Sequence, residues 1–101
     1  MFVSGTTGFN YETMTIVDGV AEQAKQCLWN IDEALRKAGS RLADMVTDTY
    51  VLPNGQDFEA CWPMLRKYFG QVGPAAMMVS ATLLDPRMKI EIEVTAMMKS
   101  I

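Results

Sequence analysis

The sequence contains no histidine among its 101 residues. Imidazole is the commonest general base and the commonest transition-metal ligand in proteins. Its absence excludes every Ser-His and Cys-His nucleophile pair. Any chemistry of this chain must therefore use carboxylates, hydroxyls, backbone amides or water.

Cysteine is scarce as well, with Cys27 and Cys61 as the only two. Each lies on the apolar side of a predicted helix, where a thiol behaves as a small hydrophobic group. We expect two buried thiols rather than a disulfide.

A basic run is also missing, since nine Lys and Arg face twelve Asp and Glu, for a net charge of −3. This excludes the electrostatic surface expected of a nucleic-acid-binding protein. No apolar run approaches the roughly 20 residues that span a bilayer, and the N-terminus lacks the pattern of a signal peptide. We expect one soluble, cytoplasmic domain over residues 1–101, with neither nucleic acid nor membrane as a partner.

Apolar residues at steps of three and four predict an amphipathic helix over residues 20–38. Asp18 is expected to cap this helix and Gly39 to end it. The predicted buried stripe consists of Val20, Ala24, Cys27, Leu28, Ile31, Ala34, Leu35 and Ala38.

A second helix is predicted over residues 57–69, with its aromatic residues turned inward and Gly70 as its end. Pro63 interrupts this pattern because proline lacks an amide hydrogen and clashes with the preceding turn. Two alternatives remain open: the helix kinks at Pro63, or its regular part starts near that residue.

Strands are predicted at residues 1–5, 43–52, 75–83 and 88–97, and a loop or irregular hairpin at 6–13. The last two strands are expected to pair antiparallel. The order of elements predicts an α+β fold with two helices on one face of a mixed sheet. The other face is then either wet or buried against copies of the chain, and nine methionines favour self-association. The methionines expected to fill the core or an interface are Met77, Met78, Met97 and Met98.

The last strand has one apolar and one charged face. Ile90, Ile92, Val94 and Ala96 alternate with Lys89, Glu91, Glu93 and Thr95. Because side chains alternate along a strand, the carboxylates share one face, which borders either solvent or a polar cleft. The pattern alone does not choose between these two.

Four segments carry a resemblance to a known family. They are Phe2-Val3-Ser4-Gly5, the helix from Ala21 to Gly39, Pro74-Ala75, and Ile90-Glu91-Ile92-Glu93. In order and spacing, over almost the whole chain, these segments resemble the RidA family, also called YjgF or endoribonuclease L-PSP. The resemblance implies a chorismate-mutase-like fold and a homotrimer whose sheets form a central barrel with the helices outside. It also implies three clefts between subunits, each holding a small molecule.

The resemblance further implies hydrolysis of reactive imines and enamines to a keto acid and ammonia, without metal or cofactor. In such a site Glu91 matches the glutamate that activates water, and Ser4 and Gly5 match part of the ligand-binding wall. An arginine follows the Pro-Ala pair in the family and grips the substrate carboxylate. This sequence has Ala76 there, so Ala76, Met77 and Met78 form a more apolar wall. Glu91 has a structural alternative, as a solvated residue or one paired with Lys89 or Arg87 of a neighbour, and Glu93 is expected to be structural.

The start of the chain is a second departure from the family pattern. Relatives carry a first strand with a site tyrosine before the segment that matches residues 1–5. Either the chain is truncated, or a shorter fold forms with an exposed strand edge. Neither Tyr11 nor Tyr50 replaces the missing tyrosine in position.

Loss of a buried arginine–carboxylate contact costs on the order of 2–5 kcal/mol of binding energy. With this arginine replaced by Ala76, the family resemblance implies a trimer that binds a small metabolite with weak or no deaminase activity. The alternative is a working imine deaminase in which Glu91 activates water. Ribonuclease activity is disfavoured because histidine, a basic groove and a metal-binding carboxylate cluster are all missing from the sequence.

Overall fold

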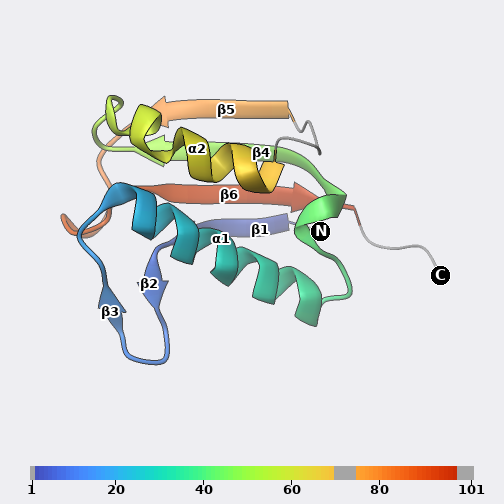
Figure 1. Cartoon of the computed structure of the whole chain (residues 1–101). Helices are drawn as coiled ribbons and strands as arrows, with labels where there is room; N and C mark the ends of the chain where they lie inside the picture. The colour runs from blue at the N-terminus through green and yellow to red at the C-terminus, as the bar shows by residue number, and fades with distance from the viewer. Residues whose placement is uncertain (1, 70–74, 98–101) are drawn as a thin grey trace.

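The computed structural model of this chain describes residues 2–69 and 75–97, with the backbone only at positions 2, 43, 68, 69, 75 and 76. A four-stranded sheet in the order β1-β6-β4-β5 carries two helices on one face (Figure 1). The sheet consists of β1 (Phe2–Thr7), β4 (Met45–Leu52), β5 (Ala75–Ser80) and β6 (Glu91–Ala96). The remaining elements are the hairpin of β2 (Phe9–Asn10) and β3 (Thr15–Ile16), the helices α1 (Val20–Lys37) and α2 (Asp57–Phe69), and a short 3₁₀ turn, η1 (Leu42–Asp44). The predicted α+β class is confirmed.

The neighbours of β6 differ from those predicted. β6 lies between β1 and β4 and is antiparallel to both, whereas β5 pairs with β4 in parallel. The expected β5–β6 hairpin was wrong, because the long segment 81–90 lets the chain pass from the sheet edge to its centre. At the centre, Ile92 and Val94 are both buried, at 0% and 1% exposure. The strand with the most regular apolar alternation thus takes one of the two inner positions of the sheet, and β4 takes the other.

Helix α1 follows the predicted stripe except at Ala34, and its predicted cap is wrong. Asp18 does not cap it, since Gly19 is the N-cap and no side chain bonds to the first turn. Asp18 instead lies 3.3 Å from the Lys89 Nζ. Ala34 is exposed, because the stripe that packs on the sheet passes to Leu35 instead. Gly39 ends the helix as expected, with a φ of +85° that favours glycine.

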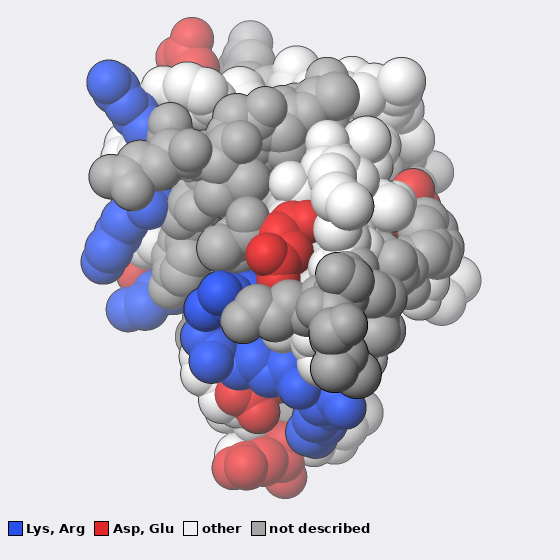
Figure 2. Space-filling model, turned by 90° about the vertical axis from the view of Figure 1, so that its right-hand side faces the viewer, with Lys and Arg blue, Asp and Glu red and all other residues white. Residues whose placement is uncertain are grey.

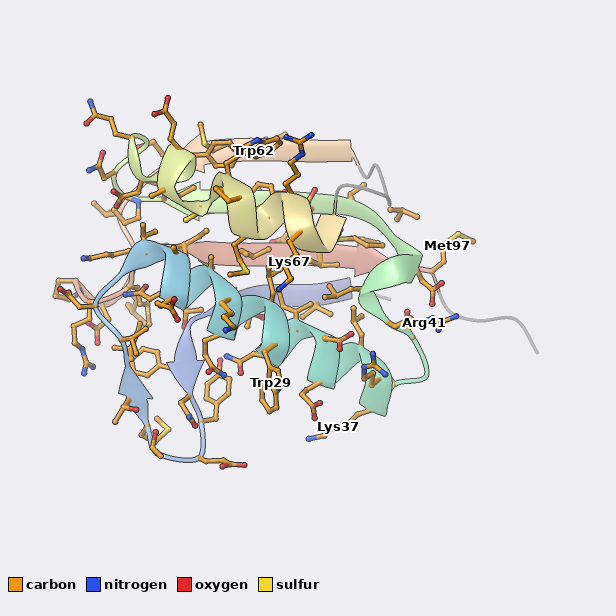
Figure 3. All side chains as sticks on the ribbon, viewed as in Figure 1. Trp29, Lys37, Arg41, Trp62, Lys67 and Met97 are labelled. Carbon is orange, nitrogen blue, oxygen red and sulfur yellow. The ribbon has the colours of Figure 1, made fainter. Side chains whose placement is uncertain are left out.

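Helix α2 begins at Asp57 and continues through Pro63, so a start near Pro63 is wrong. Its aromatic face is only partly inward. The Phe58 ring contacts those of Tyr50 and Trp62 at centroid distances of 6.0 and 5.6 Å, but Trp62, labelled in Figure 3, remains 50% exposed. The predicted stop at Gly70 lies outside the described residues.

The core lies between the helices and the inner sheet face. It is formed by Ala24, Cys27, Leu28, Ile31, Leu35, Leu42, Met45, Tyr50, Leu52, Cys61, Leu65, Ile90, Ile92, Val94 and Ala96. Both cysteines are buried and free, as predicted. Burial raises the pKa of Cys61 to about 11 and that of Cys27 further, so both thiols stay protonated at neutral pH.

No helix among the described residues covers the other face of the sheet. It presents Thr47, Thr49 and Val51 of β4 and Glu91, Glu93 and Thr95 of β6, which alternate with the core residues. Met77, Met78 and Met97 are between 48% and 64% exposed, so they do not fill the core of this chain. Met98 lies outside the described residues.

Gln23 holds several segments together from inside the fold. Its side chain is 0% exposed. Its Nε2 donates to the carbonyls of Val17 and Arg87, both at 2.8 Å, and its Oε1 accepts from the Lys89 amide at 2.8 Å. A Cβ on Gly8 would lie 2.6 Å from the Gln23 carbonyl oxygen, so glycine is required for this close approach. Gln23 thus ties the segment that enters β6 to helix α1.

Both helices end in basic residues, namely Arg36 and Lys37 in α1 and Arg66 and Lys67 in α2. Figure 2 shows this end of the molecule, where basic side chains lie with acidic ones among them. Arg36 pairs with Asp32 at 2.7 Å. Cations at helix C-termini complement the helix dipole, which accounts for their position without a ligand.

Candidate functional site

A β-bulge places the predicted wall residues Ser4 and Gly5. Val3 pairs with Val94 and Thr6 with Ile92, so Ser4 and Gly5 together oppose the single residue Glu93. The Thr6 hydroxyl donates to the Ser4 carbonyl at 2.9 Å and holds the bulge in shape. Bulges change the direction of nearby side chains and are common beside functional sites.

The bulge brings Gly5 against Glu91. Glu91 lies in β6 between Thr7 of β1 and Val51 of β4, and its side chain is half-buried. A Cβ built on Gly5 would lie 2.6 Å from both the Cδ and an Oε of Glu91. The missing side chain at Gly5 therefore makes the space that the Glu91 carboxyl occupies.

None of the described cations pairs with Glu91. Arg87 binds Asp85 at 2.8 Å, and Lys89 lies beside Asp18. The structural alternative, a solvated Glu91 or one paired with Lys89 or Arg87 of a neighbour, stays open because it involves solvent or a second copy. The Glu91 carboxylate remains available for a ligand, a water molecule or a group from another copy.

Met77 and Met78 lie apart from Glu91. Met77 pairs with Thr49 on the uncovered face, whereas Met78 pairs with Tyr50 on the helix side, and both are in β5. Strand β4 separates β5 from β6. A single chain therefore does not bring the two halves of the predicted ligand site together. Ala76 pairs with Asp48 in the backbone register, but its side chain lies outside the described residues.

Asp48 is a buried carboxyl group that sequence reasoning missed. It is 2% exposed, and neither of its oxygens has a hydrogen-bond partner among the described residues. Burial raises its pKa to about 6, although its own backbone amide offsets part of this effect. The sequence held one signal that Asp48 faces the core. It lies two residues before Tyr50, and alternate residues of a strand share a face.

Two other kinds of feature are absent from the described ranges. Groups of three or more His, Cys, Asp or Glu side chains close enough to hold a metal ion do not occur among these residues. Neither described helix is long and apolar enough to cross a bilayer.

Replacing Gly5 with alanine is expected to push the Glu91 carboxyl aside, because the new methyl group collides with it, at a cost of up to about 1 kcal/mol since the carboxyl is the far end of a flexible side chain. Urea unfolding measures this change. The Gly55→Ala variant is the control, since a Cβ there meets nothing within 4 Å. A cost at position 5 above about 3 kcal/mol, with none at position 55, would show that the Glu91 carboxyl cannot move aside.

Comparison with known proteins agrees with the fold. Residues 1–98 match the family model described as endoribonuclease L-PSP. A RutC family protein of Pyrococcus abyssi is 35% identical over 97 residues, which cover 95% of this chain and 76% of the relative. Human 2-iminobutanoate/2-iminopropanoate deaminase is 33% identical over 97 residues, which cover 95% of this chain and 71% of the human protein.

Solved structures give the same result. A Thermotoga maritima protein described as a putative endoribonuclease superposes with a TM-score of 0.91 at 31% identity, covering 99% of this chain and 80% of that one. The yjgF gene product of E. coli superposes with a TM-score of 0.85 at 30% identity, covering 94% and 77%. The match thus extends over both helices and all four strands of the sheet. This chain belongs to the RidA/YjgF family, the family of the endoribonuclease L-PSP model.

Proposed function

We propose that this protein is a homotrimer that binds a small metabolite in clefts between subunits, with weak or no imine deaminase activity. One observation carries the proposal. The Glu91 carboxylate lies against the Gly5 backbone with no described cation beside it, while Ala76 stands where the family resemblance expects a carboxylate-binding arginine. The cleft thus has the Glu91 carboxylate for contact with a ligand, but it lacks the arginine that would bind the carboxylate of an imino acid.

The separation of the site residues supports the trimer. Glu91 and the β5 methionines lie on either side of β4, so a cleft that contains both needs β5 from a second copy. The uncovered sheet face also carries exposed apolar side chains, with Met77 at 61% and Val79 at 38%. Burying them against another copy is favourable by the hydrophobic effect.

An imine deaminase is the second candidate, favoured by the relatives named 2-iminobutanoate/2-iminopropanoate deaminase. In this reaction Glu91 takes a proton from water as the water oxygen adds to the imine carbon. The proton then passes to the nitrogen, which gives a carbinolamine. The hydroxyl proton of the carbinolamine also moves to the nitrogen, the C–N bond breaks as the C=O bond forms, and keto acid and ammonia leave. Water is the only co-reactant, so no cofactor is needed for the balance.

Imine hydrolysis distinguishes the two candidates. Short-lived imines are generated enzymatically from a panel of amino acids, and keto-acid formation is followed with the wild type and the Ala76→Arg variant. The first proposal expects acceleration only with Ala76→Arg. Acceleration by the wild type, lost in Glu91→Gln but kept in Glu93→Gln, would establish the deaminase instead.

Asp48 requires one further variant in this assay. Position 76 pairs with Asp48 across the β4–β5 ladder, so an arginine introduced there has a carboxylate as its cross-strand neighbour. The double variant Asp48→Asn/Ala76→Arg removes that competing charge. If neither variant accelerates hydrolysis while light scattering gives a trimer mass, the proposed location of the cleft is wrong.

A further inference from the structure

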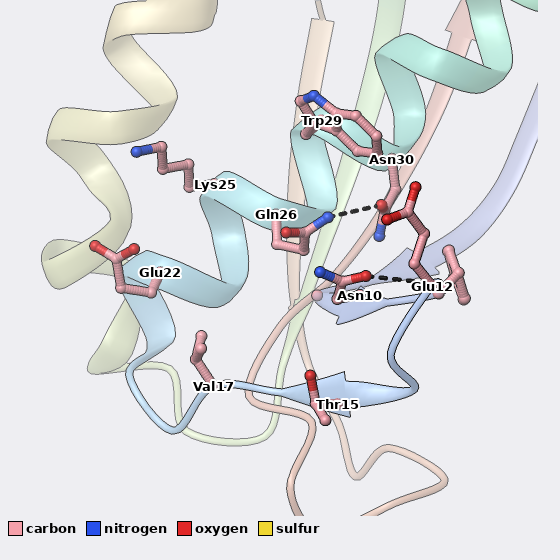
Figure 4. A pocket seen from close by; sticks show the side chains of 11 residues that line it. Asn10, Glu12, Thr15, Val17, Glu22, Lys25, Gln26, Trp29 and Asn30 are labelled. Carbon is pink, nitrogen blue, oxygen red and sulfur yellow. Dashed lines mark hydrogen bonds between the residues drawn. The ribbon is translucent and has the colours of Figure 1, made fainter.

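A second pocket lies away from Glu91, on the helix side of the sheet. It has a volume of about 540 Å³ and lies between the β2–β3 hairpin and the first half of α1 (Figure 4). Glu91, in contrast, extends from the sheet face that no described helix covers. The two sites are therefore distinct, and a ligand of this pocket does not depend on the proposed function.

Side-chain amides, of which Asn30 is buried, hold the walls of this pocket in place. The Asn30 Nδ2 on α1 donates to the carbonyls of Thr7 and Phe9 at 3.1 and 2.8 Å, which fixes the base of the hairpin to the helix. The Asn30 Oδ1 accepts from Gln26 Nε2 at 3.0 Å. The Asn10 Oδ1 accepts from the Glu12 amide at 3.0 Å and orders the hairpin tip. The pocket is thus preformed, which lowers the entropic cost of binding.

The groups left unsatisfied at one end of the pocket are electron-rich. Trp29 and Tyr11 line it while remaining 55% and 58% exposed, so their ring faces are accessible. The Glu12 carboxylate has no described ion pair, and the Gln26 Oε1 has no described donor. Aromatic faces, a carboxylate and a carbonyl oxygen all attract positive charge.

Lys25 is the one cation among the lining residues, and it lies at the other end. Glu22 also lines the pocket, three residues before Lys25 on α1, where side chains of a helix are neighbours. In Figure 4, Glu22 and Lys25 lie together on one side, and Glu12 extends from the hairpin on the side of Trp29. Glu22 compensates Lys25, so Glu12 is the uncompensated charge beside the indole.

We propose that this pocket binds a small aliphatic cation with a guanidinium or ammonium group. The cation lies on the Trp29 or Tyr11 ring, pairs with Glu12 and donates a hydrogen bond to the Gln26 Oε1. Its aliphatic part extends toward Val17, which lines the opposite wall. Ring face, carboxylate and carbonyl oxygen together distinguish such a ligand from a neutral molecule of the same shape.

Tryptophan fluorescence tests the proposal directly. Trp29 and Trp62 are the only tryptophans, so in a Trp62→Phe background Trp29 is the single reporter. Butylguanidinium is titrated against butylurea, a neutral molecule of nearly the same shape. We expect a saturable change with butylguanidinium, with a Kd on the order of 1 mM for so small a ligand, and no saturation with butylurea.

Two charge variants localise the binding. Glu12→Gln should weaken butylguanidinium binding about five-fold, whereas Glu59→Gln, which removes an exposed charge from α2, should leave it unchanged. Lys25→Gln should strengthen binding, because it removes a like charge from the pocket. Equal responses to butylguanidinium and butylurea, or equal affinities of the Glu12→Gln and Glu59→Gln variants, would overturn the proposal.

A last comparison separates a free cation from a basic side chain of a peptide. N-acetylargininamide carries the same head group on a peptide backbone. Weaker binding than butylguanidinium supports a small free ligand. Tighter binding assigns the pocket to a peptide and overturns the proposal in the form stated.

Discussion

Replacing Asp48 with asparagine is expected to raise the free energy of unfolding at pH 8 by about 2 kcal/mol. Asp48 is almost fully buried without a described hydrogen-bond partner, and burial raises its pKa from 3.8 to about 6. The native state therefore favours the protonated carboxyl, which asparagine imitates. The buried amide of asparagine cancels part of the gain, because it too lacks a partner.

The sign of the pH dependence follows from the raised pKa. The stabilising contribution of the protonated group is fully present below the unfolded-state value near 3.8 and is lost as the pH rises through about 6. Wild-type stability should therefore fall between pH 4 and pH 7, and Asp48→Asn should remove this fall. Urea unfolding at fixed protein concentration measures both proteins.

The fully exposed Asp18 provides the control for this experiment. Asp18→Asn should leave the fall in stability between pH 4 and pH 7 in place. If Asp48→Asn instead destabilises the protein at pH 8, the Asp48 carboxylate has a cationic partner in the assembled protein, and its burial without a charge partner is refuted.

Replacing Gln23 with alanine is expected to cost about 3 kcal/mol of stability. The substitution removes three hydrogen bonds, leaves a cavity under α1, and deprives two carbonyls and one amide of their partner. The Lys89 amide is one of these groups. The segment that leads into β6, just before Glu91 in the sequence, should therefore become more mobile. Urea unfolding gives the global cost, and hydrogen exchange at the Lys89 amide gives the local one.

Gln56→Ala is the matched control, since Gln56 is exposed and none of its described hydrogen bonds uses the side chain. It should change stability by less than about 0.5 kcal/mol. Similar costs at positions 23 and 56, or unchanged exchange at the Lys89 amide, would show that Gln23 does not hold the two segments together.

Several predictions from the sequence were confirmed because they depend on local periodicity. The two helices, the end of α1 at Gly39 and the inward Ile92 and Val94 follow from spacings of three to four or of two, which the backbone geometry imposes. The helices on one sheet face and the membership in the RidA/YjgF family were confirmed as well. The single domain without the first family strand, the cytoplasmic location and the site roles stay predictions.

Other predictions failed where a distant segment decides the outcome. Because β5 and β6 are consecutive in the sequence, they were expected to pair. Strand pairing depends on which partners bury each face, and β6 pairs with β1 and β4 instead. Asp18 was expected to cap α1, yet the helix begins one residue later with Gly19 as its N-cap, and the Asp18 carboxylate lies beside Lys89, far along the chain. Trp62 was assigned to the core, although only Phe58 on that side of α2 reaches Tyr50.

The candidate site divides in the same way. The sequence by itself determined that Glu91 lies on a polar strand face and that no histidine takes part, because alternation and composition need no partner. Only the tertiary structure decided that Gly5 makes room for the Glu91 carboxyl, that Asp48 is buried without a described partner, and that β4 separates Glu91 from β5. Alternation within a strand gives the face on which each residue lies, but which strands and side chains meet is set by packing between segments far apart in the chain.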